Sequence, residues 1–233
     1  KVWTSFAQTA DWIFVLARTD PEAPKHRGLS FFMVDLKQPG VTIQPLIDMA
    51  DEHVINQEYF ADVKVARNAL VGELNRGWYV AATTLDFERT GIAWAARARR
   101  RLDDLVEYCR EARHFGRRLW DNPAVRRRLV ERRIEVEVTR YISYRVAAMQ
   151  AAGEIPNLEA SMAKMFNTDV GQRVVLDGVD ILGLHGQWRE DRAPLAGEMP
   201  LWYLNTVPDS IESGTNEIQR NVIATRGLGL PRV

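Results

Sequence analysis

Two short segments, LDFER at residues 85–89 and ESGTNE at residues 212–217, contain carboxylates that could accept a proton. A carboxylate in a reaction cleft can act as a general base, whereas a serine hydroxyl such as that of Ser213 cannot do so unaided. Glu88 could instead form an ordinary ion pair with a neighbouring helix, because the chain contains many arginines. Glu212 could be an exposed acid near the start of a helix, where negative charge is favourable. Residue types alone leave these alternatives open.

Helical periodicity predicts the elements that carry both segments. The predicted helices cover residues 78–114, 124–152, 156–182 and 209 to about 226. Asn122 and Pro123 precede and begin the second of them, where a side-chain cap and a fixed backbone angle are favourable. Four long helices with short connections predict an antiparallel four-helix bundle over residues 73–233.

Short runs of apolar and β-branched residues come before the helices. These candidate strands cover residues 11–19, 29–36, 41–46 and 58–65. Glycine and proline lie between the runs, as is typical of strands joined by turns. Residues 1–72 are therefore predicted to form a small antiparallel β-domain, and the fold class is α+β, with the β-domain before the bundle.

Composition restricts the function. The chain of 233 residues has 46% hydrophobic and 27% charged residues, enough for packed domains, and its formal net charge of zero argues against nucleic acid as a partner. The single Cys109 excludes an internal disulfide and favours a reducing, cytoplasmic compartment. No apolar run is long enough to span a bilayer, no signal peptide is visible, and no metal site is expected. Because the sequence starts at Lys1 and not at methionine, an N-terminal portion is expected to be missing.

Five segments, in this order and spacing, resemble the acyl-CoA dehydrogenase family over essentially the whole chain. They are KVWTS with ADW within residues 1–12, NALVG with RGW within 68–78, LDFER at 85–89, HFG at 114–116 and GTNEIQR at 214–220. The resemblance implies a partial middle β-domain in residues 1–72 and a C-terminal helical domain in residues 73–233, without the family's N-terminal helical domain. It also implies FAD as cofactor and an acyl-CoA thioester as substrate. A carboxylate removes the α-proton while a hydride leaves the β-carbon for the flavin N5.

The resemblance also indicates which residue is the base. Much of the family has a glutamate immediately before the Gly-Thr of the last helix, where this chain has Ser213. Isovaleryl and long-chain types instead place the base on an earlier helix, at the position of Glu88, so we predict Glu88 as the catalytic base. Glu212 is one residue before Ser213, which turns it about 100° around a helix. Asp86, Arg89 and Ser213 are expected near the substrate; the alternative for the two charged residues is a solvated helix position.

Flavin-binding residues follow from the same resemblance. Trp3 is expected to cover a face of the flavin ring, and the hydroxyl of Ser5 to meet the N5 region. Thr215, Glu217 and Phe115 match further positions at the cofactor site. The alternatives are core packing for Trp3 and Phe115 and a polar strand-edge position for Ser5.

The chain departs from the family where one subunit completes the FAD site of its neighbour. The family holds the diphosphate there with an arginine and a glutamine, but this chain has Ala112 and Asp180 at those positions, and Leu184 replaces a glycine. Losing a guanidinium removes a bidentate contact, and a carboxylate repels a pyrophosphate. We therefore expect an α2β2 hetero-oligomer with a second acyl-CoA dehydrogenase-like subunit, similar to actinobacterial enzymes of sterol side-chain degradation. Electron-transfer flavoprotein is the expected electron acceptor. A non-catalytic structural subunit and an acyl-CoA oxidase are alternatives for the function. The alternative for the assembly is a homo-oligomer with one FAD per chain, in which Arg113 takes the place of the missing arginine and Asp180 turns away to pair with a neighbouring arginine.

Overall fold

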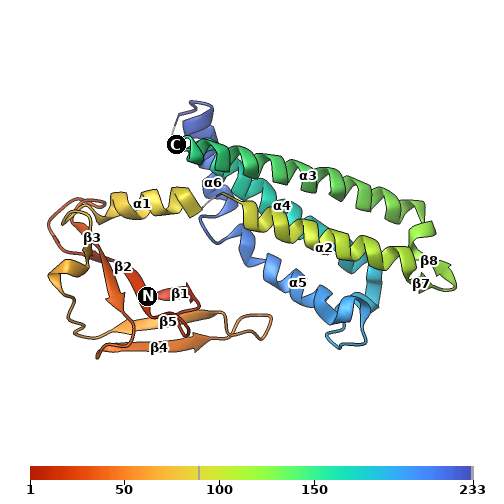
Figure 1. The fold of residues 1–233 in the computed structure, drawn as a ribbon, viewed down its shortest axis with the longest axis horizontal. Coiled ribbons are helices and arrows are strands. Elements are labelled where there is room, and N and C mark those ends of the chain that lie inside the picture. The colour runs from red at the N-terminus through yellow and green to blue at the C-terminus, as the bar shows by residue number, and fades with distance from the viewer. Residues whose placement is uncertain (89, 232–233) are drawn as a thin grey trace. The chain divides into compact units, whose positions relative to one another are not determined.

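Two antiparallel sheets form in the first part of the chain (Figure 1). One has the strand order β1-β5-β4, made of Val2–Ser5, Ile55–Phe60 and Val41–Leu46. The other has the order β2-β3-β6, made of Trp12–Arg18, Leu29–Asp35 and Leu70–Val71. All of these neighbours pair in the antiparallel sense. The predicted antiparallel β-domain is confirmed, although β5 begins at Ile55 instead of residue 58.

Helices predominate in the rest of the chain. The computed structural model describes residues 1–88 and 90–231. The helices are α1 (Gly77–Glu88), α2 (Ile92–Glu111), α3 (Pro123–Ala151), α4 (Asn157–Leu182), α5 (Glu198–Thr206) and α6 (Asn216–Val222). In Figure 1, α2, α3 and α4 run side by side, which confirms a helical bundle after the sheets and the α+β fold class. None of the described helices is long and apolar enough to cross a membrane.

The chain divides into two compact units, Lys1–Leu85 and Asp86–Val233, which we call the β unit and the helical unit. The division falls within α1, whereas the predicted boundary after residue 72 follows the end of β6 at Val71. The predicted boundary therefore marks the change from strands to helices.

Apolar side chains of α2, α3 and α4 form the main core of the helical unit. Its buried members include Leu102 and Leu105 of α2, Val136 of α3 and Val174 of α4. Full burial of one such side chain contributes about 1.5–3 kcal/mol. The predicted start of α3 is confirmed, because the Asn122 side chain accepts a hydrogen bond from the Ala124 N–H at 2.9 Å.

The prediction of a single helix over residues 78–114 is wrong, because the helix is interrupted between the end of α1 at Glu88 and the start of α2 at Ile92. Gly91 lies in the break with a φ of 75°, a left-handed conformation that favours glycine. A Cβ at Gly91 would lie 2.5 Å from Nδ2 of Asn167, so α4 leaves no room for another residue. The same Nδ2 donates a hydrogen bond to the Gly91 carbonyl at 3.0 Å. This contact with α4 keeps the break in place.

The last part of the chain also differs from the predicted helix over residues 209–226. Ser213 and Gly214 both have positive φ, of 52° and 86°, so a helix cannot pass through them. α6 starts only after them, and the Thr215 hydroxyl caps it by accepting from the Ile218 N–H at 3.3 Å. A further helix, α5, was not predicted, and its Met199 is 1% exposed and packs in the bundle core.

Cys109 offers a direct test of the core of α2. Its side chain is fully buried, and burial raises the pKa of the thiol to about 11. We expect a thiol reagent at pH 8 to react with the native protein at least about 10³-fold more slowly than with the urea-unfolded chain, since thiolate is the reactive form. Comparing the two labelling rates by absorbance checks this, and rapid native labelling would contradict the buried position.

Candidate active site

A pocket in the helical unit joins the two acidic segments of the sequence. It has a volume of about 240 Å³ and is lined by Glu88, Thr90, Gly91, Ala93, Trp94, Arg97, Glu212 and Ser213. Glu88 reaches it from the end of α1, and Ser213 from the turn before α6. The break at Gly91 lets residues from the end of α1 and the start of α2 line one hollow. We call it the Glu88 pocket.

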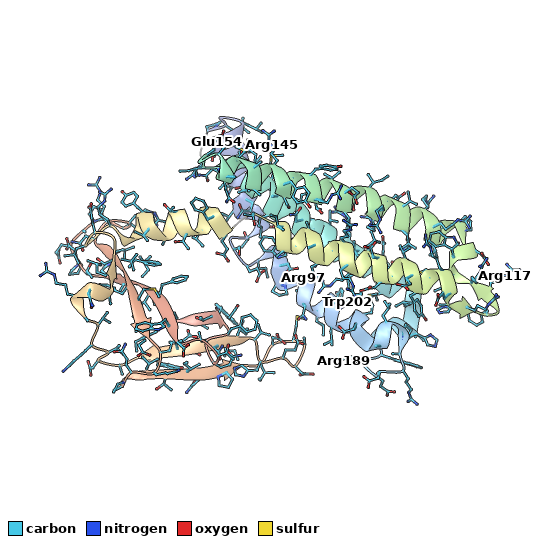
Figure 2. All side chains as sticks on the ribbon, in the orientation of Figure 1. Arg97, Arg117, Arg145, Glu154, Arg189 and Trp202 are labelled. Atoms are coloured by element: carbon cyan, nitrogen blue, oxygen red, sulfur yellow. The ribbon has the colours of Figure 1, made fainter. Side chains whose placement is uncertain are left out.

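Glu212 is a second carboxylate in this pocket, and it interacts with the buried Asp209. Asp209 and Trp94 both lie close enough to Glu212 to influence its carboxyl group. Loss of hydration raises the pKa of both carboxyl groups, at the buried Asp209 and at Glu212 where it lines the pocket, and their proximity raises that of Glu212 further. Arg97 of α2, labelled in Figure 2, lies 3.9 Å from Asp209 and acts in the opposite direction. Glu212 is exposed and precedes a helix, as expected, but its carboxyl group holds a proton more readily than a free glutamate.

A buried lysine of α4 holds Asn216, the first residue of α6. Lys164 is 0% exposed, and its Nζ donates to Oδ1 of Asn216 at 2.9 Å. The Asn216 amide in turn donates to Asp169 at 2.8 Å. Burial lowers the pKa of Lys164, while nearby carboxylates, Glu212 first, favour its charged form. These contacts hold the start of α6, which follows the turn that contains Ser213.

Two further predicted cofactor residues lie at the start of α6. The hydroxyl of Thr215 is the helix cap described above. Glu217 is exposed in the first turn, and hydrogen bonds from its own backbone N–H and from Thr215 lower its pKa. Both side chains therefore have local roles in α6, which do not by themselves indicate a cofactor.

Trp3 and Ser5 belong to the β unit and are exposed there. Trp3 is 69% exposed, so it does not pack in the core. Its φ is 70°, and the register of β1 on β5 shifts at this residue, which makes it a β-bulge. Ser5 follows on the same strand, and the structure gives its hydroxyl no hydrogen-bond partner among the described residues. An exposed aromatic side chain and a free hydroxyl suit the face and edge of a flat ring.

A larger hollow of about 810 Å³ lies at the end of the bundle, where β7 (Arg113–His114) and β8 (Arg117–Arg118) form a hairpin. Ala112, Phe115, Asp180 and Leu184 all line it. Phe115, at the tip of the hairpin, is fully exposed with a φ of 50°, so its alternative position in the core is wrong. The positions at which the sequence departs from the family therefore share one surface.

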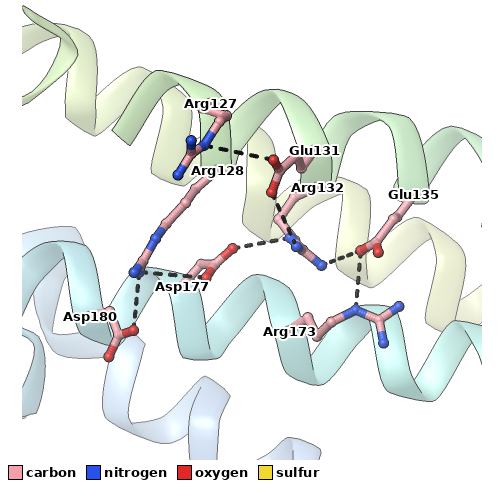
Figure 3. Close-up of polar contacts among 8 residues, drawn as sticks. All are labelled: Arg127, Arg128, Glu131, Arg132, Glu135, Arg173, Asp177 and Asp180. Carbon is pink, nitrogen blue, oxygen red and sulfur yellow. Dashed lines mark hydrogen bonds and ion pairs between the residues drawn. The ribbon is translucent and has the colours of Figure 1, made fainter. Parts of the chain in front are cut away.

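Asp180 is held by an arginine of α3. Figure 3 shows Arg128 between Asp177 and Asp180 of α4, with Nη1 of Arg128 at 3.1 Å from the Asp180 carboxylate. This pair belongs to a chain of ion pairs that continues through Arg132, Glu135 and Arg173. The carboxylate of Asp180 is thus partly neutralised, which weakens its repulsion of a bound pyrophosphate.

Two predicted substrate residues cannot be placed. Arg89 lies outside the described residues, and so does the side chain of Asp86. Sequence reasoning also missed Trp94, Arg97 and Asp209, which surround Glu212. Their spacing offered a signal, because Trp94 and Arg97, like Asp209 and Glu212, are three residues apart and thus face one way on a helical turn.

Comparison with known proteins assigns the helical part to a described family. Residues 75–228 match the family model described as "Acyl-CoA dehydrogenase, C-terminal domain". Over the full chain, the sequence is 35% identical to "Acyl-CoA dehydrogenase IpdE1" of Mycobacterium tuberculosis (strain ATCC 25618 / H37Rv), across 58% of that relative's length.

Solved structures have the same fold. The "Tcur3481-Tcur3483 steroid ACAD" superposes with a TM-score of 0.90 at 32% identity, over 100% of this chain and 60% of that one. The ChsE4-ChsE5 complex from Mycobacterium tuberculosis gives a TM-score of 0.88 at 30% identity, over 99% of this chain and 60% of that one. The chain thus spans about three-fifths of the length of these relatives.

Proposed function

The chain belongs to the acyl-CoA dehydrogenase family, and from this premise we propose that it is a subunit that desaturates an acyl-CoA thioester with Glu88 as the base. One observation carries the proposal: Glu88 and Ser213 line the same pocket. The family's usual base position, immediately before Gly214, holds a hydroxyl here, and the carboxylate of Glu88 opens into the same space. A base at Glu88 therefore accounts for the absence of a carboxylate at Ser213.

The reaction requires a proton and a hydride to leave neighbouring carbons. Glu88 takes the α-proton of the thioester, and the electrons of that C–H bond form the new double bond as the hydride leaves the β-carbon. A bound FAD supplies the hydride acceptor. Because an α-proton of a thioester is only weakly acidic, donors aimed at the carbonyl oxygen must stabilise the negative charge that develops there.

The chain's own residues fit a flavin in two respects. Trp3 is an exposed aromatic side chain, and Ser5, two residues further along the strand, has a hydroxyl without a hydrogen-bond partner among the described residues. In the helical unit, the hollow beneath the hairpin brings Arg113, His114 and Phe115 together, which supports a half-site for part of a neighbour's cofactor. These features support FAD as the cofactor.

A heteromeric assembly is the second part of the proposal. Ala112 and Asp180 leave this chain without the arginine and glutamine that the family uses to hold a neighbour's diphosphate. Structural relatives include the ChsE4-ChsE5 complex and a steroid acyl-CoA dehydrogenase named for two components. We infer an α2β2 arrangement with a partner that supplies these residues, a sterol side chain as the acyl group, and electron-transfer flavoprotein as the oxidant.

Anaerobic titration tests the proposed activity. We expect the full-length protein, purified with its partner, to lose its flavin absorbance near 450 nm when an acyl-CoA substrate is added without oxygen. A non-catalytic subunit would show no bleaching from its own site. Rapid return of the flavin absorbance in air, with release of hydrogen peroxide, would identify an oxidase instead.

A further inference from the structure

The buried face of β5 carries polar side chains in the β unit. Asn56 and Glu58 are two residues apart, so they lie on the same face of the strand. They are 0% and 1% exposed, respectively. A buried strand face normally holds apolar residues, because a polar group removed from water needs hydrogen-bond partners. The positions of these two side chains therefore need an explanation.

Both side chains bind the same residue of β1, namely Thr4. The Thr4 hydroxyl donates to Oε2 of Glu58 at 2.7 Å, and the Asn56 amide donates to the Thr4 carbonyl oxygen at 3.2 Å. Asn56 is itself held, since its amide also donates to Gln8 at 2.6 Å and its Oδ1 contacts a ring nitrogen of His53 at 2.8 Å. Thr4 is thus fixed through its side chain and its backbone.

Thr4 stands between the two exposed residues that suit a flavin. Trp3, immediately before it, is the bulge residue with a φ of 70°, a conformation that costs about 1–3 kcal/mol for a residue other than glycine. Such a conformation persists only where the surrounding structure imposes it. Hydrogen bonds to the next residue along the strand provide that constraint.

Stability alone does not explain a buried carboxylate at Glu58, because removing its oxygens from water costs free energy. Its second carboxylate oxygen, Oε1, is buried and has no hydrogen-bond partner among the described residues. Replacing a buried polar pair with apolar residues of similar size is often neutral or stabilising. The pair is therefore better explained by the geometry that it imposes on β1 than by stability.

We propose that Asn56 and Glu58 form a buried clamp on Thr4 that holds the Trp3 bulge and sets the position of Trp3 and Ser5 toward the flavin. Asn56, Glu58 and Thr4 are positioning residues, because none of them is assigned a contact with cofactor or substrate. This inference rests on the proposed function for its flavin, but the clamp itself is a property of the β unit.

The test uses the double substitution Thr4→Val with Glu58→Leu, in the full-length protein with its partner. It removes both polar partners together, so the fold should keep its melting temperature or gain stability. We expect amide hydrogen exchange in residues 2–6 to become at least about tenfold faster and flavin affinity to fall by about tenfold. The visible circular dichroism of the flavin that remains bound should change, which a change in stability alone would not produce.

Matched variants separate positioning from stability. Thr4→Ser keeps the hydroxyl, so it should leave both the amide exchange rate of residues 2–6 and the flavin affinity at their wild-type values. Thr42→Val makes the same replacement at an exposed site on β4 of the same sheet and should leave both unchanged. Unchanged exchange and flavin affinity in the double variant would overturn the clamp. If the wild-type protein holds no flavin, the proposed function fails, while the exchange arm still decides whether the clamp fixes the strand.

Discussion

Glu88→Gln is expected to slow substrate-dependent flavin reduction by about 10²–10⁴-fold, the usual effect of removing one general base. The amide is nearly isosteric with the carboxylate and cannot accept a proton. Glu88 is exposed at the end of α1, so the fold and the bound flavin should be unaffected. Stopped-flow absorbance under anaerobic conditions measures the rate, and the flavin spectrum before mixing reports the bound cofactor.

Two controls make this result specific. Glu111→Gln removes an equally exposed carboxylate at the end of α2, outside the Glu88 pocket, and should leave the rate unchanged. Glu212→Gln shows which of the two carboxylates in the pocket is the base, because only the substitution of the base should slow flavin reduction. A normal rate for Glu88→Gln together with a large loss for Glu212→Gln would transfer the role of base to Glu212.

A rescue variant tests whether the two base positions share one substrate carbon. Adding Ser213→Glu to Glu88→Gln should restore part of the activity, since both side chains line the same pocket. Ser213 has a φ of 52°, so some strain at the new glutamate is expected and recovery should be incomplete. The absence of any rescue would show that the turn before α6 directs this position away from the α-carbon, and would leave the assignment of Glu88 intact.

Ala112→Arg with Asp180→Gln is expected to tighten FAD binding by about two to four powers of ten in the full-length protein expressed without a partner. The reason is the restored contact to the diphosphate: a hydrogen bond to a charged group contributes about 1.5–3 kcal/mol, and about 1.4 kcal/mol corresponds to a factor of ten. Before substitution, the protein alone should hold less than one FAD per chain. Native mass spectrometry counts the flavins, and equilibrium dialysis gives the affinity.

The single variants divide this gain between its two causes. Because Arg128 partly neutralises Asp180, Asp180→Gln alone should contribute less than Ala112→Arg. Arg128→Met would remove the ion pair that partly neutralises Asp180, so it should weaken FAD binding relative to the unsubstituted protein. A full complement of tightly held FAD in the unsubstituted protein expressed alone would refute the heteromeric part of the proposal, and would leave the dehydrogenase assignment standing.

Local sequence determined most of the elements of this protein. The strand over residues 41–46 matches β4, and Asn122 with Pro123 sets the start of α3, because alternation and capping act over a few residues. The family segments also led to the prediction of Glu88 as the base, with Ser213 in place of the usual carboxylate. These features depend on neighbours in the chain, so no tertiary contact was needed to predict them.

Tertiary structure decided what depends on distant contacts. The break between α1 and α2 arises where Gly91 meets Asn167 of α4, and this contact brings the end of α1 next to the turn before α6. Desolvation in the pocket and the nearby Asp209 raise the pKa of Glu212, which looked like an ordinary exposed acid in the sequence. Asp180, expected to face a pyrophosphate, pairs with Arg128 of α3. The electrostatics of a carboxylate depend on which groups surround it in space. For this chain, packing between residues far apart in sequence supplies those groups.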